Sequence, residues 1–101
     1  MKKFCVIGNP ISHSLSPAIF KYLFKFFNIN ANYHSVFLDN DKSMIDFISN
    51  NIGLYNGYNI TAPFKNTAFN VADELDPLAA ELGSVNCINI DNLKLLGFNT
   101  D

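Results

Sequence analysis

Apolar residues along the chain form short continuous runs that alternate with stretches of helical spacing. Each run is bounded by glycine, proline, asparagine or aspartate, which is typical of strands that end in turns. Five such runs predict strands: Phe4–Ile7, Tyr33–Leu38, Tyr55–Ile60, Val85–Ile90 and Leu93–Phe98. The last two flank Asp91 and Asn92, so we expect them to form a hairpin.

The segments between these runs predict helices. Pro17 suits the first position of a helix that Ser16 would cap. Its apolar residues recur at i, i+3, i+4 and i+7: Phe20, Leu23, Phe24 and Phe27. Asp39–Lys42 introduces a second helix, whose apolar residues are Met44, Ile45, Phe47 and Ile48. Pro63 opens a third helix with apolar spacing as far as Leu75, and a short fourth helix starts at Asp76-Pro77 and stops at Gly83.

The order of these elements is β-α-β-α-β-α-α-β-β, which is an α/β pattern with an antiparallel addition at the end. We therefore predict a three-layer α/β domain with a mostly parallel mixed sheet, helices on both faces and a C-terminal β-hairpin. A length of 101 residues fits one domain with a real core. Because the chain stops directly after a predicted strand, we interpret it as a piece of a longer protein.

Composition excludes several classes of function. The chain is 49% hydrophobic with a formal net charge of −2, so it suits a folded domain and offers no basic surface for nucleic acid. No apolar run approaches the roughly 18 residues of a membrane span, and the start lacks a signal-peptide core, so we expect a cytoplasmic protein. Cys5 and Cys87 fit reduced, buried thiols, while His13 and His34 have no cysteine at metal-ligand spacing.

The loop GNPISHSLSP, Gly8–Pro17, places Ser12, Ser14 and Ser16 between a strand and a helix. Ser16 has a local role as a cap, whereas Ser12 and Ser14 have none. Hydroxyl groups beside the free N–H groups of a helix start favour an anion. Because no Arg or Lys lies in the loop, a carboxylate is a better match than a phosphate.

A second polar cluster lies in GYNITAPFK, Gly57–Lys65. Asn59 and Thr61 are two residues apart in extended chain, so both side chains point to one face at the carboxyl end of a strand. Open α/β sheets bind ligands at that end. Lys65, about three residues into the helix, opposes the helix dipole, which makes it a candidate for proton transfer or simply a solvated surface lysine.

Two further residues are candidates. Asn86 lies at the start of a strand, where its amide would suit a ligand hydroxyl or would satisfy the strand end. Asp101 directly follows the last predicted strand, where a carboxylate serves a site or a turn.

In this order, the segments GNPISHSLSP, GYNITAPFK, LGSVNCIN and LLGFNTD resemble the shikimate dehydrogenase family, specifically its N-terminal substrate-binding domain. The resemblance implies NADPH-dependent reduction of 3-dehydroshikimate to shikimate, a step toward chorismate and the aromatic amino acids. It also implies that NADP is bound by a second domain, because these 101 residues contain no Gly-x-Gly-x-x-Gly segment. On this interpretation the chain alone would bind substrate at best and would not transfer hydride.

Residue roles also follow from the resemblance. Ser14 and Ser16 would bind the substrate carboxylate. Lys65 would protonate the carbonyl oxygen during reduction, with Asp101 as its catalytic partner. The ring hydroxyls would be contacted by Asn59, Thr61, Asn86 and Asp101.

Three positions depart from the usual family pattern and affect packing more than activity: Phe20, Ala62 and Cys87. Other interpretations stay open, namely a quinate/shikimate dehydrogenase that uses NAD, or a non-catalytic module that binds a small hydroxy acid. A purely structural domain would leave Lys65, Asp101 and the serines unexplained. A homodimer is possible, since the family contains monomers and dimers.

Overall fold

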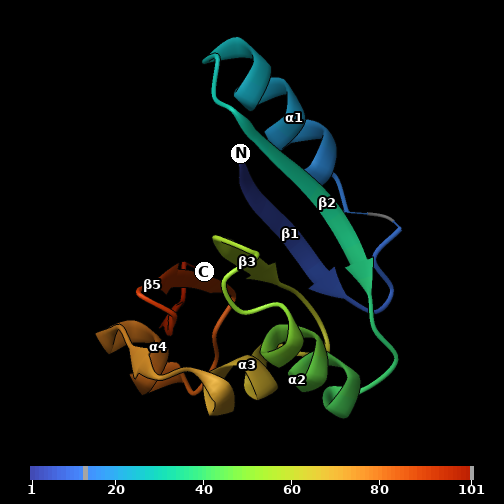
Figure 1. Ribbon diagram of the computed structural model, residues 1–101. Coiled ribbons are helices and arrows are strands. Elements are labelled where there is room, and N and C mark those ends of the chain that lie inside the picture. The colour runs from blue at the N-terminus through green and yellow to red at the C-terminus, as the bar shows by residue number, and fades with distance from the viewer. Residues whose placement is uncertain (13, 101) are drawn as a thin grey trace.

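The structure is a computed structural model that describes residues 1–12 and 14–100, so His13 and Asp101 lie outside the described residues. Helices and strands alternate along the chain until a final pair of strands (Figure 1). Their bounds are β1 (Lys2–Gly8), α1 (Ser16–Phe26), β2 (Ala31–Phe37), α2 (Asp41–Asn50), β3 (Gly57–Ile60), α3 (Lys65–Val71), β4 (Glu74–Leu75), α4 (Pro77–Leu82), β5 (Cys87–Asp91) and β6 (Lys94–Phe98).

The strands form one mixed sheet in the order β2-β1-β3-β5-β6-β4. β1 pairs in parallel with β2 and β3, and β4 pairs in parallel with β6. β5 is antiparallel to both β3 and β6, and β5 and β6 form the hairpin that the sequence predicted. The predicted α/β class, mixed sheet and C-terminal hairpin are therefore confirmed.

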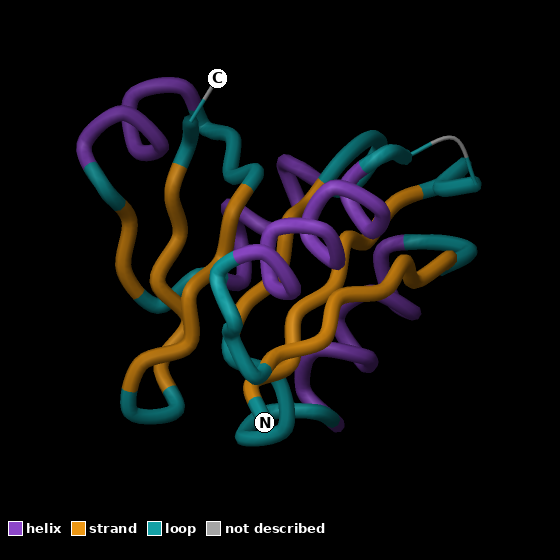
Figure 2. Tube along the Cα trace, turned by 90° about the horizontal axis from the view of Figure 1, so that it is seen from above, coloured by secondary structure: helices purple, strands orange, loops and turns teal. Residues whose placement is uncertain are grey.

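Helices cover both faces of the sheet, as predicted (Figures 1 and 2). α2, α3 and α4 pack on one face through Met44, Ile48, Ala68 and Ala79, which belong to the larger apolar core. α1 packs on the other face, where Phe20 and Phe24 contact a smaller cluster, which contains Val6, Ile11 and Tyr33. The two clusters lie on opposite sides of β1.

The continuous apolar run in β1 follows from this arrangement. Cys5 and Ile7 face the larger core, and Val6 and the partly buried Phe4 face the smaller cluster. Because successive side chains of a strand point to opposite faces, a strand covered on both faces needs apolar residues at successive positions. Burial raises the pKa of the Cys5 thiol to about 12, which keeps it protonated and consistent with a structural role.

The predicted third helix is too long. α3 ends at Val71, and Ala72 is extended with φ −65° and ψ 137°. The Asp73 N–H then donates to the Leu95 carbonyl over 2.8 Å, and the Asp73 carboxylate accepts from the Leu95 N–H over 2.8 Å. These bonds start β4, a two-residue strand that the sequence did not predict and that pairs with β6.

Among the residues that the structure describes, no helix is both long and apolar enough to cross a membrane.

Candidate functional site

A pocket of about 480 Å³ opens at the carboxyl ends of β1 and β3, and we call it the polar pocket. Six of the seven predicted site residues line it: Ser14, Ser16, Asn59, Thr61, Lys65 and Asn86. The remaining wall is apolar and is formed by Val6, Pro10, Ile11, Phe20 and Ile60. The seventh predicted residue, Asp101, lies outside the described residues.

Pairing of β1 with β3 brings two distant loops together. The Thr61 N–H donates to the Ile7 carbonyl over 2.9 Å, and the Asn9 N–H donates to the Ala62 carbonyl over 3.0 Å. Gly8 lies between these bonds, and a Cβ on Gly8 would collide with the Thr61 methyl carbon Cγ2. Glycine at this position therefore lets the serine loop approach the end of β3.

The serine loop differs from its prediction in one respect. α1 is preceded by Leu15 as its N-cap residue, without a side-chain cap, and Ser16 is the first helical residue. The local hydrogen bond is made by Ser14, whose Oγ accepts from the Ser16 N–H over 3.3 Å. The expected Ser16 cap is therefore wrong, because Ser16 already has its place inside the helix. Ser12 is exposed and does not line the polar pocket.

Lys65 is the first residue of α3, not the third as expected, because Ala62 and Pro63 form a turn closed by the Phe64 N–H on the Thr61 carbonyl. Phe64 is fully buried and anchors the helix start. The Lys65 carbonyl accepts from the Val85 N–H over 3.1 Å, so the lysine backbone is tied to the segment before β5. The half-buried Lys65 side chain lines the polar pocket together with Thr61.

The Asn86 side chain satisfies a strand end, which is one of the two roles that the sequence left open. Its Nδ2 donates to Thr100 Oγ1 over 3.0 Å and its Oδ1 accepts from the Thr100 N–H over 3.1 Å. Its backbone carbonyl also accepts from the Ile60 N–H over 2.8 Å. Asn86 therefore joins the ends of β3 and β6 while it lines the polar pocket.

Sequence reasoning missed Tyr33 of β2, whose side chain contacts two residues that line the polar pocket, Asn59 and Phe20. Its hydroxyl donates to Asn59 Oδ1 over 2.8 Å, and its ring stacks on Phe20 with centroids 4.5 Å apart. Burial raises the pKa of Tyr33 to about 12, while a side-chain hydrogen bond with Ser16 acts in the opposite direction. A tyrosine in a buried strand normally needs a partner for its hydroxyl, and this was the available signal in the sequence.

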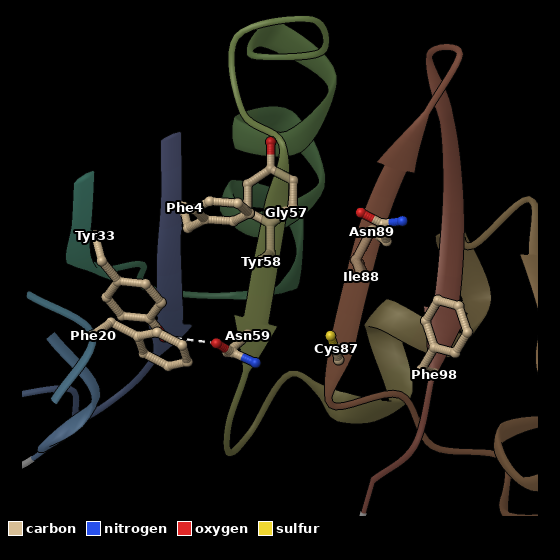
Figure 3. Close-up of a pocket in the computed structure, with 10 residues that line it drawn as sticks. All are labelled: Phe4, Phe20, Tyr33, Gly57, Tyr58, Asn59, Cys87, Ile88, Asn89 and Phe98. Atoms are coloured by element: carbon tan, nitrogen blue, oxygen red, sulfur yellow. Dashed lines mark hydrogen bonds between the residues drawn. The ribbon is translucent and has the colours of Figure 1, made fainter. Parts of the chain in front are cut away.

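A second hollow, of about 300 Å³, lies on the α1 side of the sheet, and we call it the apolar pocket (Figure 3). Its aromatic lining residues come from β1, α1, β2, β3 and β6: Phe4, Phe20, Tyr33, Tyr58 and Phe98. Asn59 and Cys87 lie between these rings, and Phe20 and Asn59 line both pockets. Two of the three positions that depart from the family pattern, Phe20 and Cys87, thus line this pocket.

Among the described residues, no cluster of three or more His, Cys, Asp or Glu side chains could hold a metal ion. The polar pocket thus offers hydroxyl, amide and ammonium groups for ligand binding.

A family model for the shikimate dehydrogenase substrate binding domain matches residues 6–88. This span contains the six predicted site residues that line the polar pocket. The chain belongs to this family. The resemblance noted in the sequence is thereby confirmed.

Curated relatives of this substrate-binding domain are named shikimate dehydrogenase (NADP(+)). The protein from Bacillus cereus (strain 03BB102) is 41% identical over 97 residues, which make up 95% of this chain and 35% of that relative. The protein from Bacillus cytotoxicus is also 41% identical over 97 residues. The domain therefore spans about a third of the length of the curated relatives it matches.

Solved structures agree with this assignment. Shikimate dehydrogenase 1 from Peptoclostridium difficile has a TM-score of 0.92 at 31% identity, over 99% of this chain and 38% of that one. Shikimate 5-dehydrogenase from Thermus thermophilus, solved in complex with NADP(H) and shikimate, has a TM-score of 0.93 at 29% identity, with the same coverage.

Proposed function

We propose that this domain is the substrate-binding part of an NADP-dependent shikimate dehydrogenase, which interconverts 3-dehydroshikimate and shikimate. The observation that carries the proposal is the polar pocket, where six predicted substrate-binding residues from separate segments share one cavity at the strand ends. Its volume of about 480 Å³ falls in the range of small-molecule sites. Homology to enzymes named for this activity supports the same substrate class.

Ser14 and Ser16 would bind the substrate carboxylate. Ser14 Oγ accepts from the Ser16 N–H, and this leaves the Ser14 hydroxyl hydrogen able to donate to an anion. Both side chains lie beside the start of α1, where the helix dipole also favours negative charge. Neutral donors of this kind suit a carboxylate.

Asn59, Thr61 and Asn86 would contact the ring hydroxyls. Thr61 follows β3 directly and Asn86 precedes β5 directly, so the antiparallel pairing of these strands places both residues at the same edge of the sheet. Amide and hydroxyl groups both donate and accept, as recognition of a polyol requires.

Lys65 would act in proton transfer with Asp101. In the reductive direction the Lys65 ammonium donates a proton to the carbonyl oxygen of 3-dehydroshikimate, and in the oxidative direction the amine accepts the proton of the alcohol. Asp101 would orient and balance the charge of that lysine. Bound NADPH supplies the hydride. We place its binding in a further domain of the protein, since no glycine-rich phosphate loop occurs in this chain.

The test is an NMR titration of the protein with shikimate in the absence of cofactor. We expect saturable amide shifts at Ser14, Ser16, Asn59, Thr61 and Lys65, even at roughly millimolar affinity, about −4 kcal/mol. Ser14→Ala should weaken the response, and Ser12→Ala is the matched control because Ser12 lies in the same loop outside the pocket.

Two results would count against the proposal. Shifts scattered over the surface, without saturation at the polar pocket, would mean that the pocket does not bind shikimate. Stronger binding of quinate than of shikimate in a parallel titration would instead favour a quinate/shikimate dehydrogenase.

A further inference from the structure

Tyr33, which is buried, and Asn59, which is partly buried, form a side-chain pair at the wall shared by the two pockets. The Tyr33 hydroxyl donates to Asn59 Oδ1 over 2.8 Å, and Tyr33 is only 2% exposed. Tyr33 belongs to β2 and Asn59 to β3, and the hydrogen bond crosses β1, which lies between them in the sheet. The pair therefore links two strands that do not pair with each other.

This hydrogen bond decides which end of the Asn59 amide faces the polar pocket. A phenol that donates to Asn59 must meet the carbonyl oxygen, because the NH₂ end has no lone pair to accept. In Figure 3 the Asn59 nitrogen lies on the side away from Tyr33. Asn59 also lines the polar pocket, so the end it has available for a ligand there is the NH₂ donor.

Tyr33 itself is held from two directions. Phe20 of α1 stacks on its ring at 4.5 Å with an interplanar angle of 14°. Its hydroxyl is held by the hydrogen bond to Asn59 Oδ1 at 2.8 Å. Both partners belong to the protein, so the phenol is held before any ligand arrives.

We propose that Tyr33 is a positioning residue that holds the Asn59 amide with its NH₂ group toward the ligand. This inference rests on the proposed function of the polar pocket and deepens it. It makes Asn59 a hydrogen-bond donor, so the ligand atom there must accept, as a hydroxyl oxygen does. A ligand with an ammonium group at that position would be rejected, because two donors would face each other.

The first test needs no ligand. The hydrogen bond should set the side-chain ¹³Cγ resonance of Asn59, and Tyr33→Phe should shift it because the ring stays while the hydroxyl is lost. Tyr55→Phe is the matched control, since Tyr55 is also buried and its hydroxyl hydrogen-bonds His34 Nε2 over 2.8 Å, outside the pocket lining. An Asn59 resonance that is the same in the wild type and in Tyr33→Phe would overturn the inference.

The second test measures shikimate affinity. Tyr33→Phe should weaken binding by about fivefold to tenfold, the usual size for one hydrogen bond, while Tyr55→Phe leaves it unchanged. Asn59→Asp retains an acceptor for Tyr33 but loses the donor, so it should weaken binding more than Tyr33→Phe does. Asn59→Asp that binds as well as the wild type would overturn the donor role.

The double variant Tyr33→Phe with Asn59→Ala completes the cycle. It should bind no more weakly than Asn59→Ala alone, because Tyr33 acts through Asn59. The double variant also keeps the inference testable if Tyr33→Phe does not fold. Without the Asn59 amide, no side-chain carbonyl oxygen at this position is left without a donor. Additional loss in the double variant would overturn the positioning role.

The two proposals fail separately. A wild type that does not bind shikimate contradicts the proposed function, and the ligand-free resonance still decides the role of Tyr33. Equal shikimate affinity in the wild type and in Tyr33→Phe contradicts the role of Tyr33 and leaves the proposed function in place.

Discussion

The polar and apolar pockets share Phe20 and Asn59 but are built in different ways. The polar pocket lies where β1 and β3 end, and its lining comes mainly from loops and helix starts. The apolar pocket lies against the middle of the sheet, and its lining comes mainly from strands. Backbone N–H and C=O groups at the strand ends are no longer paired within the sheet, and polar side chains gather there. Positions in the middle of the strands instead carry aromatic side chains that line the apolar pocket.

This difference separates binding from stability. Ser14 and Lys65 contribute groups that a ligand can use, and neither belongs to the apolar clusters. Phe20 and Tyr33 pack in the smaller cluster, so they contribute to the free energy of unfolding. Truncation of Ser14 or Lys65 should therefore change ligand binding or turnover, and removal of a ring from the smaller cluster should change stability.

The largest effect is expected for Lys65→Ala. Removal of a group that transfers a proton typically lowers kcat by about 10²–10⁴-fold, and here substrate binding should be largely retained. Steady-state kinetics of the full-length protein measure both quantities. The control is Lys42→Ala, since Lys42 is exposed on α2 and pairs with Asp46 at 2.8 Å. Near-normal turnover of Lys65→Ala would remove it from catalysis.

Phe20→Ala should lower the free energy of unfolding by about 2–4 kcal/mol, because it leaves a gap between α1 and Tyr33. Urea denaturation measures this change. Tyr22→Ala is a control on the same helix, where the side chain is 65% exposed and truncation should cost much less. Equal losses in the two variants would show that the face of α1 toward the sheet is no more important for stability than its outer face.

Tyr33 also predicts an alkaline loss of stability. Its pKa is about 12 in the folded chain and 10.0 in its ordinary state, so its contribution is complete below pH 10. It is lost as the pH rises through 12, by about 2–3 kcal/mol, because the unfolded chain releases the proton first. Denaturation of the wild type and Tyr33→Phe at pH 8 and pH 11 tests this, and an equal pH dependence in both would contradict it.

Ser14→Ala should have the smallest effect, a loss of about 1–3 kcal/mol in substrate affinity with little change in the free energy of unfolding. Calorimetric titration and denaturation of the same sample measure the two quantities. Unchanged affinity would remove Ser14 from the site. A fall in the free energy of unfolding equal to the fall in affinity would mean that Ser14 contributes to stability as much as to binding.

Local patterns predicted most of the fold. The run FCVI predicted the strand β1, and Asp91-Asn92 predicted the hairpin. β4 was missed because Val71 and Leu75 fit helical spacing. The outcome there depends on hydrogen bonds between Asp73 and Leu95, which are 22 positions apart. A window of neighbouring residues contains no information on that pairing.

The site shows the same limit. Six pocket residues could be named in advance from three motifs, through their polar side chains and through the family resemblance. The exchange of roles between Ser14 and Ser16 depends on where α1 begins, which is a matter of backbone geometry within one residue. The contact of Tyr33 with Asn59 crosses β1, so only the assembled sheet shows it.

The polar pocket forms where Gly8 packs against Thr61 and where the Ile60 N–H at the end of β3 donates to the Asn86 carbonyl. The pocket therefore depends on the whole fold. An unfolded chain contains no partial version of it, since its parts are separated by tens of residues. A pocket ligand would thus bind the native state alone and shift the folding equilibrium by mass action, by about 2.7 kcal/mol at a hundredfold excess over Kd. The melting temperature then reports, without a label, how much of the site is occupied. Conversely, a protein that retains its ligand has an assembled sheet.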